Sequence, residues 1–190
     1  MILTINAYGH PTLRKVAQDI DSNYPNLEQL INDMFETMYH SKGVGLAAPQ
    51  VNHSIRLMVI DTIPFKKEYP EAMDMKMIMI NPYIVEETGN EWLYNEGCLS
   101  VPNIHEDVLR KSKLKIEYLD ENFNEHELEF EGINARVIQH EYDHLEGKLF
   151  VDRLTPLKKM LLKRKLTDIS KGIVDVDYKM NFPFQSKKKY

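Results

Sequence analysis

The sequence predicts an α+β fold, in which mostly antiparallel strands pack around a central helix that carries an H-E-x-x-H motif. Two observations support this prediction. Apolar residues recur every three or four positions in the segments 25–43, 132–147 and 156–170, which is the spacing of helices with one apolar face. Strand-like segments dominate the middle of the chain, so helices flank the strands and do not alternate with them as in a βαβ array.

The length and composition indicate one globular domain. The 190 residues contain no repeat, no low-complexity segment and no linker, so we expect a single domain over residues 1–190 with a helix–strand extension from about residue 156. Hydrophobic residues make up 43% and charged residues 28%, which is ordinary for a globular protein and argues against a disordered or fibrous chain.

The net charge and the single cysteine indicate in which cellular compartment the protein acts and which partners it lacks. A formal net charge of −5 does not attract DNA or an anionic membrane. The single cysteine, Cys98, excludes an intrachain disulfide and favours the cytosol. The longest apolar run, around Met77–Ile80, is far shorter than the roughly 20 residues of a membrane span. We therefore expect a cytoplasmic protein with neither a membrane nor DNA as a partner.

The first half of the chain predicts one helix and two strands. The helix opens at Pro25 and ends at Gly43, because proline is tolerated in a first turn and glycine is common after a last one. Its apolar stripe consists of Leu27, Leu30, Ile31, Met34, Phe35 and Met38. Ile55–Ile60 and Met77–Ile80 are expected to be strands, separated by a loop that contains two prolines.

A hairpin is predicted next. Leu109–Asp120 alternates between charged and apolar residues, as a half-buried strand does, and His126–Phe130 alternates again after a turn at residues 120–124. Four methionines also alternate along the chain, namely Met73, Met75, Met77 and Met79. We interpret them as side chains that pack on one face of a strand, in preference to thioether ligands of a Cu(I) site.

The last third of the chain predicts two helices and a strand. One helix follows Gly132, with Asn134 as its N-cap and Gly147 as its stop. The next runs from about Pro156 to about Ser170, and Ile173–Met180 resembles a strand. Basic residues gather on this last helix and in the tail of the chain: Lys158, Lys159, Lys163, Arg164, Lys165, Lys187, Lys188 and Lys189.

The H-E-x-x-H motif is the strongest chemical signal. His140 and His144 lie one helical turn apart and therefore on one face, where two imidazoles can share a metal ion. The alternative is a pair of core or surface histidines that happen to have helical spacing. A catalytic centre needs a third protein ligand, and Cys98, preceded by a glycine, is the candidate. Spacing alone favours a different role for this cysteine, as a small buried side chain.

A third segment, Gly43–Gln50, combines two glycines with small residues. It lacks the Lys-Ser/Thr of a phosphate-binding loop, but it suits close approach of a ligand to the backbone, and Gln50 offers an amide donor. An ordinary tight connection is an equally good interpretation of this segment alone.

Together the three segments resemble the peptide deformylase family. Gly43–Gln50 matches its G-x-G-L-A-A-P-Q motif, Glu96–Ser100 its E-G-C-L-S motif, and Gln139–Gly147 its Q-H-E-x-D-H-L-x-G motif. The motifs occur in the order of the family, and the resemblance spans roughly residues 1–155.

The resemblance implies a metal and a reaction. Cys98, His140 and His144 would bind one divalent ion, natively Fe²⁺ in the family, for which Zn²⁺, Ni²⁺ or Co²⁺ can substitute. The reaction would be hydrolytic removal of the N-formyl group from the N-terminal methionine of newly made polypeptides, with release of formate, through a metal-bound hydroxide.

Such a hydrolysis also needs a proton carrier and donors for the developing oxyanion. We expect Glu141 to take a proton from the metal water and return it to the leaving amine. The side-chain NH₂ of Gln50 and the backbone N–H of Leu99 would hold the oxyanion.

The expected substrate pocket begins at Gly43–Gly45, which would close around the formyl group. Val44 and Val137 would form the wall around the methionine side chain. His105 stands where the family often carries an arginine that contacts the peptide, and Arg110 is expected to pair with Glu96. The expected substrate-binding residues are thus Gly43, Val44, Gly45, Val137 and His105.

The expected partners are nascent formyl-methionyl polypeptides. Some members of the family end in a helix that contacts the ribosome, but this chain is expected to add a strand and a tail after its helix, so that docking mode does not simply carry over. A transient ribosome contact through the basic C-terminal region is a further expectation, and a solvated surface is the alternative interpretation of these charges. Two other functions stay open at this point: a cysteine hydrolase that uses Cys98 with a histidine base, and a metal-stabilised, ribosome-associated module without turnover.

Overall fold

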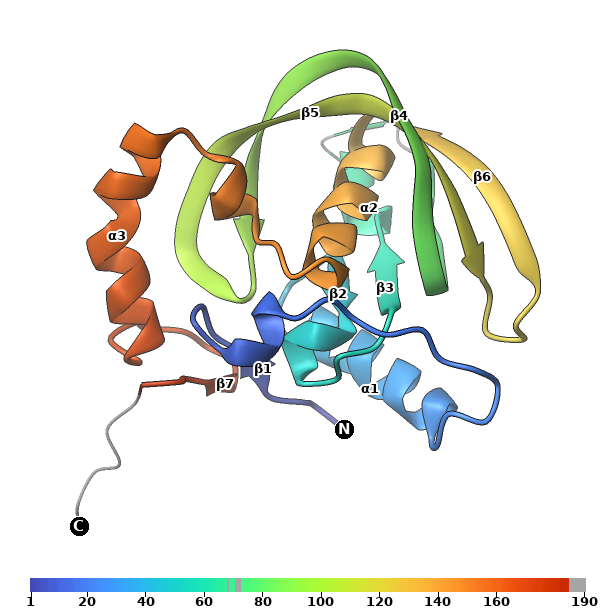
Figure 1. Cartoon of the computed structure of the whole chain (residues 1–190), viewed down its shortest axis with the longest axis horizontal. Coiled ribbons are helices and arrows are strands. Elements are labelled where there is room, and N and C mark those ends of the chain that lie inside the picture. The colour runs from blue at the N-terminus through green and yellow to red at the C-terminus, as the bar shows by residue number, and fades with distance from the viewer. Residues whose placement is uncertain (68, 71–72, 185–190) are drawn as a thin grey trace.

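The computed structural model describes residues 1–67, 69–70 and 73–184. Its helices and strands follow one another in the order shown in Figure 1. The helices are α1 (Leu27–His40), α2 (Gly132–Leu145) and α3 (Pro156–Ser170). The strands are β1 (Ile5–Asn6), β2 (Gly45–Ala47), β3 (Leu57–Asp61), β4 (Lys76–Cys98), β5 (Val101–Leu119), β6 (Glu125–Glu131) and β7 (Met180–Asn181).

The five strands from β2 to β6 form one antiparallel sheet in the order β2-β3-β4-β5-β6. The long strands β4 and β5 arch over α2, which lies in the middle of the molecule (Figure 1). Strands β1 and β7, from opposite ends of the chain, form a separate parallel pair. The α+β prediction, with antiparallel strands around the helix that carries the H-E-x-x-H motif, is confirmed.

The centre of the sheet is buried on both faces. Successive residues of a strand point to opposite sides, so Met58 and Ile60 of β3 face α2, whereas Leu57 and Val59 face α1. All four side chains have no exposed surface. This double burial explains why β3 has a continuous apolar sequence, and it fixes β2 and the loop before it against α2.

Strand β4 is much longer than the predicted Met77–Ile80. It pairs with β3 at its beginning and with β5 along its remaining length, and irregularities in the register, such as those between Ile84 and Glu86 and between Thr88 and Glu91, bend it. Residues 86–91 are exposed, so this stretch has no apolar alternation from which a strand could be predicted. The bend carries the end of β4, at Cys98, back beside α2.

The helices begin and end close to the predicted positions, with one wrong cap. Helix α1 starts at Leu27 after a left-handed Asn26 and ends three residues before Gly43. Asn134 is not the N-cap of α2, since the helix begins at Gly132 after Glu131. The amide of Asn134 instead donates to Thr62 Oγ1 (3.1 Å) and so ties α2 to the end of β3. The predicted stop at Gly147 is confirmed.

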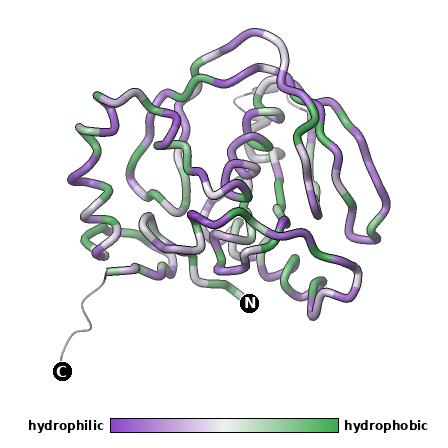
Figure 2. The backbone as a smooth tube through the Cα atoms, in the orientation of Figure 1, coloured by the Kyte–Doolittle hydropathy of each residue, from purple (hydrophilic) through white to green (hydrophobic). Residues whose placement is uncertain are grey.

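The C-terminal strand prediction is wrong for most of its length. Only Met180–Asn181 is a strand, paired with Ile5–Asn6, whereas residues 173–179 have no regular structure. The helix before them has the predicted bounds, and hydrophilic and hydrophobic residues alternate along it (Figure 2). The predicted basic tail at residues 187–189 lies outside the described residues. Within the described ranges, no helix is both long and apolar enough to cross a membrane.

Of the four alternating methionines, Met77 and Met79 lie in β4, whereas Met73 and Met75 precede it. Met79 and Met75 are buried in the cluster that contains α2, and Met73 is exposed. The predicted single strand face is therefore correct only from Lys76 onwards.

Ile138 tests how much α2 contributes to stability. Its side chain is fully buried between the helix and the sheet, so Ile138→Ala should lower the free energy of unfolding by about 2–5 kcal/mol. Ile173→Ala, the same change at a side chain that is 66% exposed, should cost about 0.5 kcal/mol or less. Urea denaturation of both variants measures the difference, and equal losses would show that Ile138 does not anchor α2 to the sheet.

Candidate metal centre

Three side chains from two elements converge where β4 ends against α2. His140 and His144 project from the same face of α2, and Cys98 is the last residue of β4. The ligand atoms of the three residues all lie within 4.8 Å of one another, and Cys98 Sγ is 3.3 Å from His144 Nε2. One thiolate and two imidazoles are a donor set for a divalent transition metal with an open coordination position, so the residues fit the predicted ion.

The two histidines are presented to this point in different ways. His140 Nδ1 lies 2.8 Å from Glu96 Oε2, which leaves Nε2 facing Cys98 and His144. His144 is buried, and its Nδ1 has no hydrogen-bond partner among the described residues. Burial and the neighbouring His140 lower the pKa of His144 to about 3. The neutral imidazole that results is the form that binds metals.

Glu96 is the centre of a buried ion-pair network. Its two oxygens accept hydrogen bonds from Arg110 (2.7 and 2.9 Å), and Oε1 also accepts one from Arg136 (2.9 Å). Burial alone would raise the pKa of Glu96, but Arg110 and His140 outweigh it and hold this pKa well below its usual range. The expected pair of Arg110 and Glu96 is therefore present. Arg110 continues the network to Asp143 of α2 at 2.7 Å.

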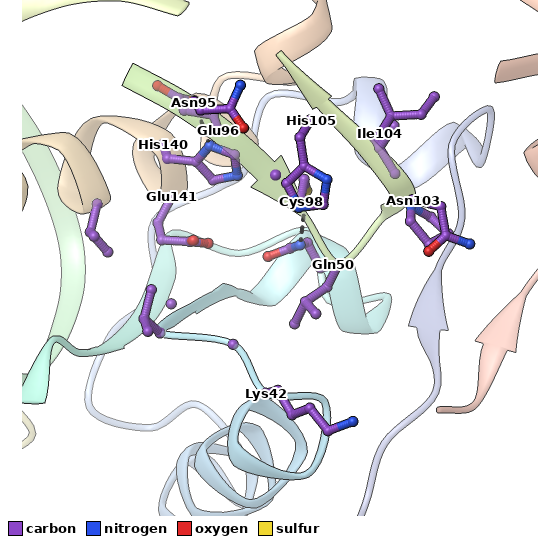
Figure 3. Close-up of a pocket in the computed structure, with 18 of the residues that line it drawn as sticks. Lys42, Gln50, Asn95, Glu96, Cys98, Asn103, Ile104, His105, His140 and Glu141 are labelled. Atoms are coloured by element: carbon purple, nitrogen blue, oxygen red, sulfur yellow. Dashed lines mark hydrogen bonds and ion pairs between the residues drawn. The ribbon is translucent and has the colours of Figure 1, made fainter. Parts of the chain in front are cut away.

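Glu141 lies beside the three ligands. Its carboxylate points toward the same central space as the ring of His140 and the amide of Gln50 (Figure 3). Its Oε2 is buried and has no hydrogen-bond partner in the part of the chain that the structure describes, and burial raises its pKa to about 7. A Cβ atom at Gly45 would lie 2.5 Å from Glu141 Oε1, so only glycine leaves room for this carboxylate.

Gln50 approaches the three candidate ligands from the side opposite Glu141 (Figure 3). It lies in a short 3₁₀ turn, Ala48–Val51, directly after β2. Its Oε1 accepts a hydrogen bond from the Ala47 backbone (2.9 Å), which aims its NH₂ at Cys98 Sγ (3.6 Å) and Ser100 Oγ (3.3 Å). The orientation of this amide is thus fixed by its own turn.

A cavity of about 690 Å³ opens over this centre. Its lining includes every predicted substrate-binding residue, namely Gly43, Val44, Gly45, Val137 and His105, together with the predicted Gln50, Leu99 and Glu141. Cys98 and His140 also line it, whereas His144 does not. A Cβ atom at Gly97 would lie 2.6 Å from the ring of His105, so the imidazole packs against the backbone beside Cys98.

Sequence reasoning missed part of this cavity. Residues Asp175–Tyr178, which follow α3, also line it, and the hydroxyl of Tyr178 donates to the Leu99 carbonyl (2.8 Å). The segment was predicted only as part of a strand, and no local pattern indicates that it returns to the site. Arg136 and Asp143 were also missed: both lie on the charged side of α2, which is buried in ion pairs.

These features define a class of protein. Two histidines and a cysteine around one point, a buried carboxylate beside them and a fixed amide donor are the arrangement that a metal-dependent hydrolase requires. The cavity above the centre can admit a substrate.

Comparisons with known proteins identify the family. The model of the polypeptide deformylase family matches residues 2–160. The peptide deformylase of Christiangramia forsetii is 55% identical over 98% of this chain and 99% of its own. The crystal structure of a Legionella pneumophila peptide deformylase is similar with a TM-score of 0.78 and 43% identity, over 88% of this chain and 95% of that one. A class I type b peptide deformylase from Acinetobacter baumannii, in a structure described as Met-Ala-Ser bound, has a TM-score of 0.75 and 38% identity, over 81% and 99%.

The chain belongs to the polypeptide deformylase family. It is an enzyme of that family, a metal-dependent hydrolase that removes the N-formyl group from nascent polypeptides. This assignment decides against the cysteine hydrolase and against the module without turnover.

Loss of the ion pairs around Glu96 should lower the stability of the fold strongly. Glu96→Gln leaves Arg110 and Arg136 buried without their negative partner, so the free energy of unfolding should fall by about 3–5 kcal/mol. Glu127→Gln removes the partner of the half-buried Lys115 on the sheet surface and should cost about 1 kcal/mol or less. Urea denaturation of the metal-free proteins compares them, and a loss at Glu96 no larger than that at Glu127 would argue against a network that holds the fold together.

Proposed function

We propose that the cavity above Cys98, His140 and His144 is the place where the formyl group is removed, and that these residues bind one divalent ion. The convergence of their ligand atoms within 4.8 Å is the observation that carries this proposal. We further propose that the native ion is Fe²⁺ and that Zn²⁺, Ni²⁺ or Co²⁺ can replace it, because imidazole and thiolate suit all four. When bound, such an ion acts as a Lewis acid that polarises a carbonyl oxygen and lowers the pKa of coordinated water.

Glu141 is the proposed proton carrier. It follows His140 by one residue, so its side chain is turned by about 100° away from the two ligands of α2 and lies beside the central space, not in the ligand set. Its carboxylate is buried, and its Oε2 is not engaged by any described residue, so it is free to accept a proton from water and pass it to the leaving amine.

Gln50 and Leu99 are the proposed oxyanion donors. The Gln50 NH₂ is fixed beside Cys98, and a neutral amide donates a hydrogen bond without titrating. The backbone N–H of Leu99 belongs to the turn between β4 and β5, which is restrained because Tyr178 holds the Leu99 carbonyl. Donors fixed before the reaction stabilise charge that appears only during attack.

The substrate is proposed to enter with its formyl end at Gly43–Gly45 and its methionine side chain against Val44 and Val137. All of these residues line the cavity, and so does His105, which we propose contacts the peptide backbone. The Met-Ala-Ser bound structure from Acinetobacter baumannii supports a peptide with an N-terminal methionine as the occupant.

Three broader features complete the proposal. Residues 1–190 act as one catalytic domain with a helix–strand extension, because the segment after α3 contributes residues to the cavity. The basic face of α3 makes a transient contact with the ribosome, where nascent substrates emerge; Leu157, Met160 and Leu161 are also exposed on this helix.

The protein acts in the cytoplasm, consistent with its single, unpaired cysteine.

Removal of one proposed ligand tests the metal site. His144→Ala should release the ion and abolish deformylation, since two remaining ligands no longer hold it. His126→Ala removes a histidine that pairs with Asp120 on the sheet surface, and this variant should keep a full complement of metal. Elemental analysis after purification gives the ion content per chain, and a stoichiometric ion in His144→Ala would refute the assignment.

A separate variant tests the proton carrier. Glu141→Gln should retain its metal and lose about 10²–10⁴-fold in kcat, because the amide cannot carry the proton. Glu131→Gln, at an exposed position next to the start of α2, serves as the control and should behave like the wild type. A rate close to that of the wild type in metal-loaded Glu141→Gln would require a different proton carrier.

The oxyanion role of Gln50 predicts a particular kinetic pattern. Gln50→Ala should lose about 10²-fold or more in kcat while KM changes only modestly, because the lost hydrogen bond acts mainly in the transition state. Steady-state kinetics with a formyl-Met peptide, with a thermal melt and a metal assay alongside, measure this. A strong rise in KM with an intact kcat would assign Gln50 to substrate binding instead.

A further inference from the structure

The segment Asp175–Tyr178 forms one side of the cavity, although it follows α3 and lies beyond the residues that the family model matches. It has no regular secondary structure, but it is held at both of its ends. The next strand, β7, pairs with β1, and the preceding helix α3 packs through Leu162 and Leu166 in a core cluster that includes residues of β5. Its position is therefore set by the fold.

Three contacts attach the segment to the cavity. The Asn103 side chain donates to the Asp175 carbonyl (3.0 Å), and Tyr178 donates to the Leu99 carbonyl (2.8 Å), so one end of the segment meets the beginning of β5 and the other meets the turn before it. Between them, Asp177 forms an ion pair with Lys42 (2.6 Å), which precedes Gly43. The segment thus bridges the two walls that carry the proposed formyl-binding loop and the ligand Cys98.

These contacts show which end of the segment lies nearer the proposed metal ligands. Tyr178 is half-buried and lies against the residue that follows Cys98, whereas Asp175 is exposed and lies at Asn103, farther along the chain. Lys42 and Asn103 appear at the periphery in Figure 3, while Cys98 lies nearer the centre.

The cavity has room for more than one substrate residue. Its volume of about 690 Å³ lies within the roughly 300–1,000 Å³ of pockets that enclose a whole small ligand. A formyl group and one methionine side chain at the metal end leave the remaining length, beside Asp175–Tyr178, to the residues that follow the methionine.

The charge at this outer end is negative. Lys42 is neutralised by Asp177, and no cation among the described residues lies within ion-pair distance of the Asp175 carboxylate. The other carboxylate of the lining that is not a proposed reactant, Glu96, is buried and already paired with Arg110 and Arg136. Asp175 is thus the carboxylate of the lining that is free to meet a substrate cation.

We propose that Asp175–Tyr178 is the wall that contacts the nascent peptide beyond its formyl-methionine, and that Asp175 favours peptides with a lysine or arginine there. This inference deepens the proposed function, because it rests on entry of the peptide through this cavity. Tyr178 is a positioning residue in it: the hydroxyl anchors the wall to the turn that carries Cys98 and Leu99.

A charge reversal tests the specificity. Deformylation is measured on formyl-Met peptides of four residues that differ only in having Lys or Glu at the second, third or fourth position. In Asp175→Lys, the ratio of kcat/KM for the Lys peptide to that for the Glu peptide should fall at least about threefold at one of these positions, since attraction becomes repulsion. Asp175→Asn should give a smaller fall, and raised salt should shrink both effects because these charges are exposed.

Glu129→Lys provides the matched control. It makes the same change in net charge on β6, at an exposed residue that does not line the cavity, so its Lys-to-Glu ratio should equal that of the wild type. An unchanged ratio in Asp175→Lys, or a change that the control reproduces, would overturn the inference. Neither result would argue against the proposed metal site. That proposal would be contradicted by a different result, namely metal retained in His144→Ala.

A second variant tests the anchor. Tyr178→Phe removes only the hydroxyl and should raise KM for the four-residue peptides more than for formyl-Met-Ala, with an unchanged metal content. The same change in KM for both lengths would reduce Tyr178 to a purely structural residue and would contradict its role in the peptide wall.

Discussion

The carboxylate of Glu96 is the point on which the rest of the structure depends. It is buried, and it joins Arg110 of β5, Arg136 of α2 and His140 of α2 to the end of β4. A buried charge is costly unless it is fully paired, so these three elements can pack together only in the arrangement that satisfies it. The same carboxylate orients the ring of His140. The interaction that brings the sheet against the helix therefore also presents one of the proposed metal ligands.

The site depends equally on two glycines, whose lack of a side chain lets the backbone come close to neighbouring residues. At Gly45 the strand β2 passes so close to Glu141 that a Cβ atom would occupy the space of the carboxylate. At Gly97 the backbone next to Cys98 lies directly against the ring of His105. Because neither glycine has a side chain, the backbone approaches Glu141 and His105 closely, and both of these residues line the cavity.

Both ends of the chain support the turn between β4 and β5. The backbone of Tyr8, just after β1, donates to the Ser100 carbonyl, and Tyr178, just before β7, donates to the carbonyl of Leu99. Because β1 and β7 pair with each other, the two contacts form one support behind the residues that follow Cys98. The segment before β7 is thus part of the wall of the cavity, which the three family motifs alone do not form.

The sequence by itself determined the local features. Helical spacing placed His140 and His144 on one face, alternation predicted the β5–β6 hairpin, and proline and glycine marked the bounds of α3 and α2. Spacing does not show which distant residues meet, because contacts such as that between Cys98 and His144, 46 positions apart, leave no periodic signal. For that contact and for the pair of Glu96 and Arg110 the sequence offered an expectation, and the tertiary structure decided the geometry. It also decided the length of β4, whose exposed middle lacks alternation, the burial of the charged side of α2, and the return of Asp175–Tyr178 to the cavity. Each of these depends on pairing or ion pairs formed across the fold, which local spacing does not encode.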